Sequence, residues 1–122
     1  MAETSYISVP IEISRQAILD LLTIAVEEGC YYWTRSITRP TNGYDLDSKF
    51  IFVEASEDGS VEDDVEHTLD LSSLGWPKVI AGLQLMAKKH HGHFADLIGD
   101  NSDVWTADVF VQLVLLGEIR YG

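Results

Sequence analysis

Three things are scarce in this sequence, and each scarcity excludes a class of protein. Cys30 is the only cysteine among 122 residues, which rules out an internal disulfide and a zinc site made of cysteines alone. No apolar run reaches 18 residues, so the sequence contains no transmembrane helix. Lys and Arg total 8 against 20 Asp and Glu, and this net charge of −12 argues against direct binding of nucleic acid or of an anionic membrane.

The remaining composition is that of one folded domain. Apolar residues make up 46% of the chain and charged residues 23%. Residues 1–5 have neither the basic stretch nor the apolar core of a signal peptide, so we expect a protein of the reducing cytoplasm. The length predicts a single α+β domain over residues 1–122, with residues 1–10 as a flexible segment or an edge strand.

The first regular element is an amphipathic helix over residues 14–28. Ser14 is a residue type that caps helix N-termini. Ile18, Leu21 and Leu22 then follow at helical spacing, and Gly29 is suited to end the helix.

Three strands are expected next, paired as an antiparallel meander. Residues 31–38 are rich in aromatic and β-branched types, and residues 49–53 form a second run of this kind. Turn-forming residues at 40–43 and 57–60 separate the runs, and a third strand is expected over residues 61–69.

A second helix follows, which Ser72 or Ser73 would cap and in which Pro77 would occupy the first turn. We expect it to end near Gly92, with a short helical turn over residues 93–98.

The last helix is expected over residues 104–116. Residues 109–116 are apolar on nearly every side, which is typical of a helix that is surrounded. It therefore belongs at the centre of the domain or in a subunit interface, and a homodimer is one way to cover it. Gly117 would end the helix, and residues 118–121 would add a short strand. The element order predicts a three-stranded sheet with two to three C-terminal helices packed on one face.

An acidic run is the strongest local anomaly, with seven carboxylates and no Lys or Arg over residues 54–66. One interpretation is a solvated hairpin tip that opposes edge aggregation. A second is an anionic surface that imitates phosphates, with alternate acids on one strand face about 6.6 Å apart. A divalent cation site is a weaker third, because no calcium-loop motif is present. The acidic residues are Glu54, Glu57, Asp58, Glu62, Asp63, Asp64 and Glu66.

An aromatic and cationic strand face gives an alternative site. Strand alternation would place Tyr31, Trp33 and Arg35 on one face, with Arg39 following. Such a face can stack a base and hold a phosphate, so it is the best candidate for a nucleotide pocket. The competing interpretation is that the aromatic rings pack beneath the helices while Arg35 extends to solvent.

Little in the sequence supports catalysis or a cofactor. His90, His91 and His93 are clustered, but the expected helix end explains cationic and histidine residues through the helix dipole, and no metal site is assigned. Nucleophile elbows, phosphate-binding loops and dinucleotide fingerprints are all missing. We therefore expect a protein that is not an enzyme and needs no cofactor.

Five segments of the sequence form a recognisable pattern. They are Tyr31-Tyr32-Trp33 with Arg35, Leu69-Asp70-Leu71, Gly82-Leu83 with Leu85-Met86-Ala87, His93-Phe94-Ala95-Asp96, and residues 106–122. Together they resemble a group of small uncharacterised proteins encoded by bacteriophages and prophages. The resemblance spans most of residues 14–122 and is most specific in the last part.

The resemblance implies a phage accessory protein that acts inside a bacterial cell. The acidic surface would then bind the basic, nucleic-acid-binding surface of a host defence protein, such as a CRISPR effector complex, and inhibit it. Alternatives are an oligomer that sequesters a nucleotide immune signal, and a phage structural or housekeeping factor.

Overall fold

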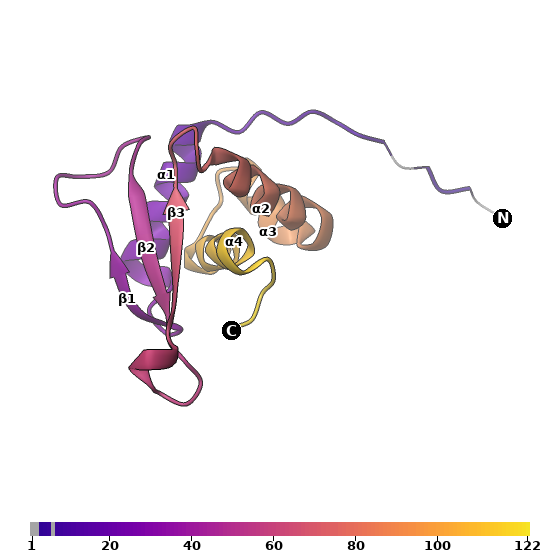
Figure 1. The fold of residues 1–122 in the computed structure, drawn as a ribbon. Helices are drawn as coiled ribbons and strands as arrows, with labels where there is room; N and C mark the ends of the chain where they lie inside the picture. Colours follow the sequence, from indigo (N-terminus) through magenta and orange to yellow (C-terminus); the bar gives the residue numbers. More distant parts are fainter. Residues whose placement is uncertain (1–2, 6) are drawn as a thin grey trace.

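A computed structural model describes residues 3–5 and 7–122, and it has the α+β architecture that the sequence predicts (Figure 1). Antiparallel strands form a sheet in the order β1-β2-β3. All four helices lie on one side of this sheet, and α2 and α3 pack against α4, so the core surrounds α4. The elements are α1 (Arg15–Ile24), η1 (Ala25–Gly29), β1 (Thr34–Thr38), β2 (Lys49–Glu54), η2 (Val61–Asp63), β3 (Val65–Asp70), α2 (Trp76–Lys89), α3 (His91–Ile98) and α4 (Val104–Leu116).

The first helix begins where the sequence places it. The Ser14 hydroxyl accepts a hydrogen bond of 3.0 Å from the Ala17 backbone N–H, as an N-cap does. The last turn widens into the π-helix η1, so the Cys30 N–H donates to the Ala25 carbonyl. This end of the helix places Cys30 in the core.

The strands confirm the meander and correct two of its boundaries. Residues 31–33 form a turn, because Trp33 is drawn into the core instead of extending along β1. Residues 61–63 form the 3-10 helix η2, so only Glu66 of the expected alternating acids lies in β3. The expected row Glu62, Asp64, Glu66 on one strand face is therefore wrong.

The three helices after the sheet agree in number with the prediction of two to three, but some of their boundaries differ. The N-cap of α2 is Gly75, not Ser72 or Ser73, although Pro77 does lie in the first turn. The expected short turn at 93–98 is a separate helix, α3, that starts at His91. Residues 118–121 form no strand and continue as an irregular tail.

The last helix, α4, is at the centre of the fold, as its composition predicts. All ten residues from Thr106 to Leu115 are buried. Gly82 of α2 permits a close approach, because a Cβ there would lie 2.5 Å from the Val114 side chain. Gly117 ends α4 with φ +75°. Since the chain itself covers α4, this helix gives no reason to expect a dimer.

The beginning of the chain is extended and pairs with no strand over residues 3–5 and 7–10. The part of the expected flexible segment or edge strand at residues 1, 2 and 6 lies outside the described residues. Within residues 3–5 and 7–122, no helix has both the length and the apolar content needed to cross a bilayer.

Candidate functional site

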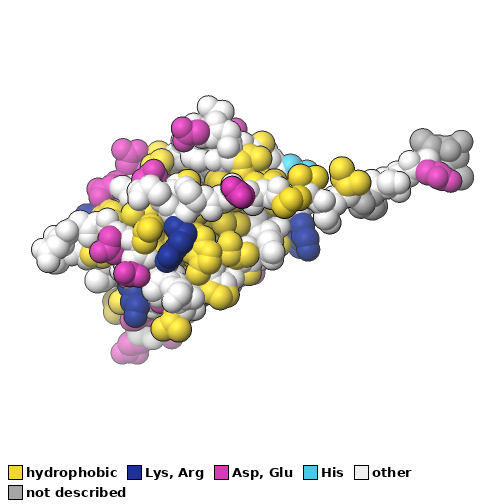
Figure 2. Space-filling view, turned by 90° about the horizontal axis from the view of Figure 1, so that it is seen from above, with side chains coloured by type: hydrophobic (Ala, Val, Ile, Leu, Met, Phe, Trp, Pro, Cys, Tyr) yellow, Lys and Arg dark blue, Asp and Glu magenta, His cyan; other side chains and the backbone are white. Residues whose placement is uncertain are grey.

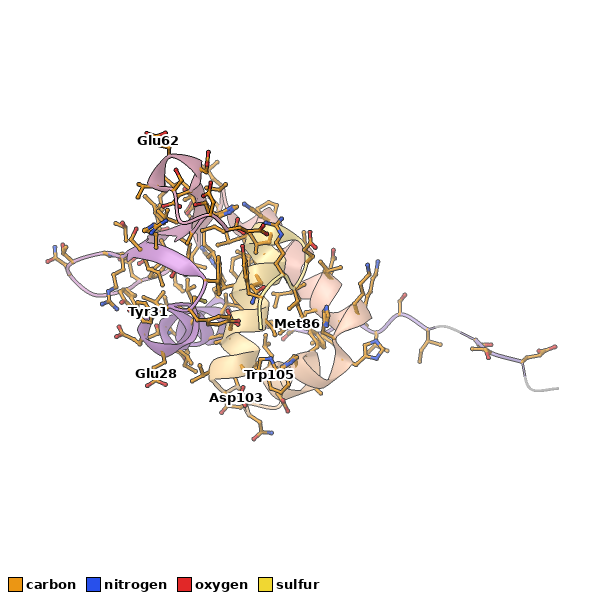
Figure 3. The ribbon with its side chains drawn as sticks, turned by 90° about the horizontal axis from the view of Figure 1, so that it is seen from below. Glu28, Tyr31, Glu62, Met86, Asp103 and Trp105 are labelled. Carbon is orange, nitrogen blue, oxygen red and sulfur yellow. The ribbon has the colours of Figure 1, made fainter. Side chains whose placement is uncertain are left out.

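The acidic loop, which we define as residues 55–64 between β2 and β3, projects from the end of the sheet (Figure 1). Figure 3 shows Glu62 at the tip of the loop, pointing away from the body of the protein. The seven acidic residues predicted as a surface divide into two kinds, those that hold the loop in shape and those that face solvent.

Glu54 is one of the structural carboxylates, since only 6% of the residue is exposed at the end of β2. Its Oε1 lies 3.0 Å from His67 Nε2, and its Oε2 accepts a hydrogen bond of 3.0 Å from Arg120 Nη1 and another from the Tyr121 hydroxyl. Burial opposes ionisation, but these hydrogen bonds outweigh it and lower the pKa of Glu54. The prediction that Glu54 belongs to an exposed surface is therefore wrong, because its partners hold it inside.

Asp64 is the second structural carboxylate. Arg35 donates to it through Nε at 2.7 Å and through Nη2 at 3.0 Å, in a bidentate pair. The Ser56 backbone N–H also donates to it at 2.9 Å, which ties the start of the loop to its end. The hydrogen bonds from Arg35 and Ser56 lower the pKa of Asp64 to about 2. Asp64 thus closes the base of the loop, and its negative charge is paired with Arg35.

Asp58 shapes the turn inside the loop while its carboxylate stays exposed. It accepts hydrogen bonds from the Ser60 backbone N–H at 2.9 Å and from the Ser56 hydroxyl at 3.0 Å, and these bonds lower its pKa. The exposed members of the acidic set are therefore Glu57, Asp58, Glu62, Asp63 and Glu66.

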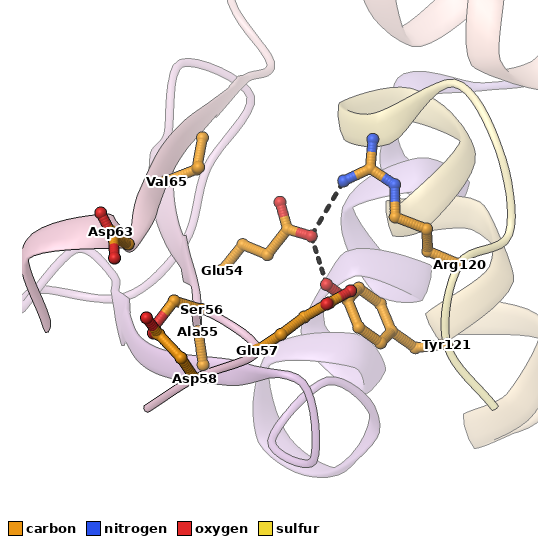
Figure 4. A pocket seen from close by; sticks show the side chains of 9 residues that line it. All are labelled: Glu54, Ala55, Ser56, Glu57, Asp58, Asp63, Val65, Arg120 and Tyr121. Carbon is orange, nitrogen blue, oxygen red and sulfur yellow. Dashed lines mark hydrogen bonds and ion pairs between the residues drawn. The ribbon is translucent and has the colours of Figure 1, made fainter. Parts of the chain in front are cut away.

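A hollow of about 460 Å³ separates the acidic loop from the C-terminal tail (Figure 4). Four carboxylates line this acidic hollow, namely Glu54, Glu57, Asp58 and Asp63, against the single cation Arg120. Arg120 is already paired with Glu54, so the remaining charge of the wall is negative. The geometry suits a cationic side chain entering from solvent.

The C-terminal tail, residues 117–122, is held by a buried polar pair that sequence reasoning missed. Gln112 accepts hydrogen bonds from the backbone N–H groups of Arg120 and Tyr121 at 2.9 and 3.0 Å. It donates to Asp108 at 3.1 Å, one turn earlier on α4. The signal in the sequence was this pair of polar residues, four apart, in an otherwise apolar helix.

Asp108 joins the same network to the turn before β1. It accepts hydrogen bonds from Trp33 Nε1 at 2.8 Å, from the Tyr32 hydroxyl, and from the Cys30 thiol at 3.5 Å. Burial and the neighbouring carboxylate raise the pKa of Cys30 and of Tyr32. Cys30 is therefore a packed thiol that stays protonated, not a nucleophile.

The predicted nucleotide-binding residues do not form one pocket. Trp33 is 2% exposed and stacks between Phe52 and Tyr121, at centroid distances of 6.4 and 5.5 Å. Arg35 is paired with Asp64.

Two other members of that set lie at the surface. Arg39 Nη1 donates to Glu27 at 3.0 Å, beyond the other end of β1. Tyr31 is half exposed in the turn before the strand. The expected aromatic face of a strand is replaced by a turn, so the core-packing interpretation holds for Trp33.

The three clustered histidines lie on both sides of the junction between α2 and α3. His90 follows α2, as a dipole argument expects, but His91 and His93 belong to α3. His93 Nδ1 lies 3.1 Å from the Thr106 hydroxyl, and its ring meets Trp105 edge-on at 4.8 Å. In the described part of the chain, no three His, Cys, Asp or Glu side chains gather as metal ligands.

Comparisons with protein-family models, curated proteins and solved structures give no match to this chain. The resemblance to the phage group stays a prediction.

Proposed function

We propose that this protein is a non-enzymatic, phage-encoded inhibitor that binds a basic surface of a host nucleic-acid-handling protein, of the CRISPR-effector type. The supporting observation is the acidic hollow, in which exposed carboxylates surround a concave site between the acidic loop and the C-terminal tail. The inhibitor acts in the bacterial cytoplasm and binds no nucleic acid itself.

The arrangement of charges favours binding through this site. Glu54 is paired with Arg120 and Asp64 with Arg35, so these two carboxylates stabilise the structure and are not available to bind a partner. The carboxylates at the rim are left for a partner's Lys or Arg side chain, which would enter the hollow and displace water. Long-range attraction between the acidic loop and a basic groove would speed association and weaken as salt screens the charges.

The ionisable side chains of the site and of the core are better suited to a binding protein than to an enzyme. The pKa values of Glu54 and Asp64 are lowered, so neither carboxyl is held protonated as a general acid at neutral pH. The only thiol, at Cys30, is enclosed and its pKa is raised.

The test is a triple variant that neutralises two exposed carboxylates of the hollow and one at the tip of the acidic loop, Glu57→Gln and Asp63→Asn with Glu62→Gln. Each exposed charge pair contributes about 0.2–1 kcal/mol, so the loss of three pairs should lower the affinity for an oligoarginine peptide about 3- to 150-fold. Phage plating on a host with nucleic-acid-targeting immunity should also lose the protection that the unchanged chain gives.

The matched control removes three charges elsewhere, by Glu3→Gln with Glu28→Gln and Asp96→Asn. Both triple variants change the net charge from −12 to −9, so a general charge effect would affect them equally. If both variants bind and protect alike, the acidic hollow is not the binding site. If the unchanged chain protects no phage on an immune host, the inhibitor function is refuted.

A further inference from the structure

The chain contains two asparagines, Asn42 and Asn101, and only Asn42 is followed by a glycine. The side-chain amide of an asparagine is open to attack by the backbone nitrogen of the next residue, and this attack closes a cyclic imide. A following glycine favours the attack, because it has no Cβ to shield its nitrogen and it adopts many backbone conformations. The reactivity of such a pair in a folded protein depends on how firmly its backbone is held.

The loop between β1 and β2, residues 39–48, projects at the left of Figures 1 and 2 and is anchored on both sides of its tip. Before the tip, Arg39 Nη1 donates to Glu27 Oε1 at 3.0 Å. After the tip, the Tyr44 hydroxyl donates to the same oxygen at 3.1 Å. The tip, residues 40–43, therefore stands out between two fixed points.

Asn42 and Gly43 both lie exposed at this tip. Gly43 has φ +88°, and apart from its chain neighbours no residue has an atom within 4 Å of the place where a Cβ would lie. In the part of the chain that the structure describes, the Gly43 N–H donates to no carbonyl and the Asn42 amide makes no hydrogen bond. The attacking nitrogen and the amide that it attacks are therefore both free to move.

A second pair able to form the same imide, Asp58 and Gly59 in the acidic loop, has the opposite arrangement. The Gly59 N–H donates to the Ser56 carbonyl at 3.2 Å. The Asp58 carboxylate accepts hydrogen bonds from the Ser60 backbone N–H at 2.9 Å and from the Ser56 hydroxyl at 3.0 Å. Both reacting groups are held by hydrogen bonds, so the two pairs differ in structure although they are alike in sequence.

We propose that Asn42 is a site of spontaneous modification in the folded protein, where its amide is converted to a carboxylate, while the Asp58 pair is protected. The Gly43 nitrogen bonds to Cγ of Asn42 and loses its proton, and the Cγ–Nδ2 bond breaks so that ammonia leaves with that proton. Water then adds to one of the two carbonyl carbons of the imide, and the bond from that carbon to the Gly43 nitrogen breaks as the nitrogen takes a proton from the water. Opening at Cγ gives aspartate and opening at the backbone carbonyl gives isoaspartate, so water is the only co-reactant.

The conversion adds a negative charge far from the acidic loop. The net charge changes from −12 to −13, and the new charge lies at the opposite end of β2, because β2 begins after residues 39–48 and ends before residues 55–64. The fixed points at Arg39 and Tyr44 confine the change to the tip, so the fold and the acidic hollow are kept. The reaction is therefore independent of the proposed inhibitor function, and the fraction of copies that carry the extra charge grows with the age of the protein.

The first test follows the reaction in the unchanged, folded chain at neutral pH. Trypsin separates the candidate residues into different peptides, namely 36–49 with Asn42, 50–78 with Asp58, and 90–120 with Asn101 and its neighbour Ser102. Reversed-phase separation and mass spectrometry then measure aspartate and isoaspartate in each. Because a mobile loop opens at almost no cost in free energy, the Asn42 rate in the folded chain should lie within about 10-fold of the rate in the isolated peptide 36–49. A lower rate overturns the proposal, as does equal conversion at Asn101.

The second test compares the folded chain with the chain unfolded in urea. Isoaspartate should form at Asp58 at least about 10-fold more slowly in the folded chain than in urea, because both hydrogen-bonded groups must first be released. Asn42 should react at similar rates in the two states. Equal rates at Asp58 would show that hydrogen bonding does not select the site, and this result overturns the proposal.

A matched pair of variants identifies the source of the new charge. Isoelectric focusing of the unchanged chain after incubation should show an additional, more acidic band. Asn42→Gln should remove this band, because the longer side chain closes an imide far more slowly, and Asn101→Gln should keep it. A band that persists with Asn42→Gln, or that Asn101→Gln removes, overturns the assignment to Asn42.

Discussion

Replacing Gln112 by Leu should release the C-terminal tail and with it one wall of the acidic hollow. Gln112 is fully buried and makes two hydrogen bonds to backbone N–H groups of the tail, at 2.9 and 3.0 Å. It also donates to the Tyr121 carbonyl at 3.2 Å and to Asp108 at 3.1 Å. Leu has a similar volume and can form none of these four bonds.

The expected loss of stability follows from these bonds. Each contributes about 1 kcal/mol net, and the tail recovers part of this by binding water once it detaches, so we expect a loss of about 2–4 kcal/mol. For a domain of this size the melting temperature should fall by roughly 8–16 °C. The control is Gln16→Leu, because Gln16 also bonds an aspartate four residues away, Asp20 at 2.9 Å, but at the surface. It should change stability by less than about 0.5 kcal/mol.

Urea unfolding followed by circular dichroism measures the stability, and hydrogen exchange at residues 118–121 measures the release of the tail. Trp33 stacks on Tyr121, so its fluorescence should shift to the red once the tail detaches. Replacing Trp76 and Trp105 by Phe isolates that signal. A loss below about 0.5 kcal/mol with unchanged exchange in the tail would refute the role given to Gln112.

Three further predictions concern the core and the ion pairs. Phe110→Ala should lower the free energy of unfolding by about 3–5 kcal/mol, because it opens a cavity beside the middle of α4. Urea unfolding measures this loss, and a value below about 1 kcal/mol would contradict the central placement of α4. Gly82→Ala should cost about 1–3 kcal/mol or more, because the new Cβ meets the Val114 backbone at 2.9 Å; an unchanged melting temperature would refute this close approach. The pKa values of Glu54 and Asp64 are lower in the folded state, so they stabilise it above their ordinary pKa values. Their contribution should be lost as pH falls from about 4.5 to about 2, and a urea midpoint that stays flat there would contradict these pairs.

Local signals in the sequence were enough to predict the elements whose cause is local. The limits of α4 follow from an apolar run that starts after Asp103, whose side chain accepts from the Thr106 N–H, and stops at Gly117. By contrast, residues 31–33 have strand-forming side chains, but the bond from Trp33 to Asp108, 75 residues away, holds them in a turn. Tertiary contacts override propensity at such positions.

The sequence predicts the region in which the candidate site lies, but not which of its carboxylates are paired and which are free. The acidic run points to the loop between β2 and β3, because charge density is visible in the sequence alone. Which carboxylates are free depends on Arg120, 66 residues from Glu54, and on Arg35, 29 residues from Asp64. No spacing rule connects such distant residues, so the sequence alone predicts Glu54 and Asp64 to be exposed like the other acids.

The way the acidic loop is built has a consequence for how the protein can evolve. Its shape is maintained by Arg35, Asp64, Ser56 and Asp58, while the exposed side chains of Glu57 and Glu62 contribute no hydrogen bond to that framework. Mutations at the outward positions therefore carry almost no folding penalty, so the pattern of exposed charges can change while the structure of the loop is kept. Under the proposed inhibitor function, a lineage that meets a changing host target would be able to alter its recognition at these positions first.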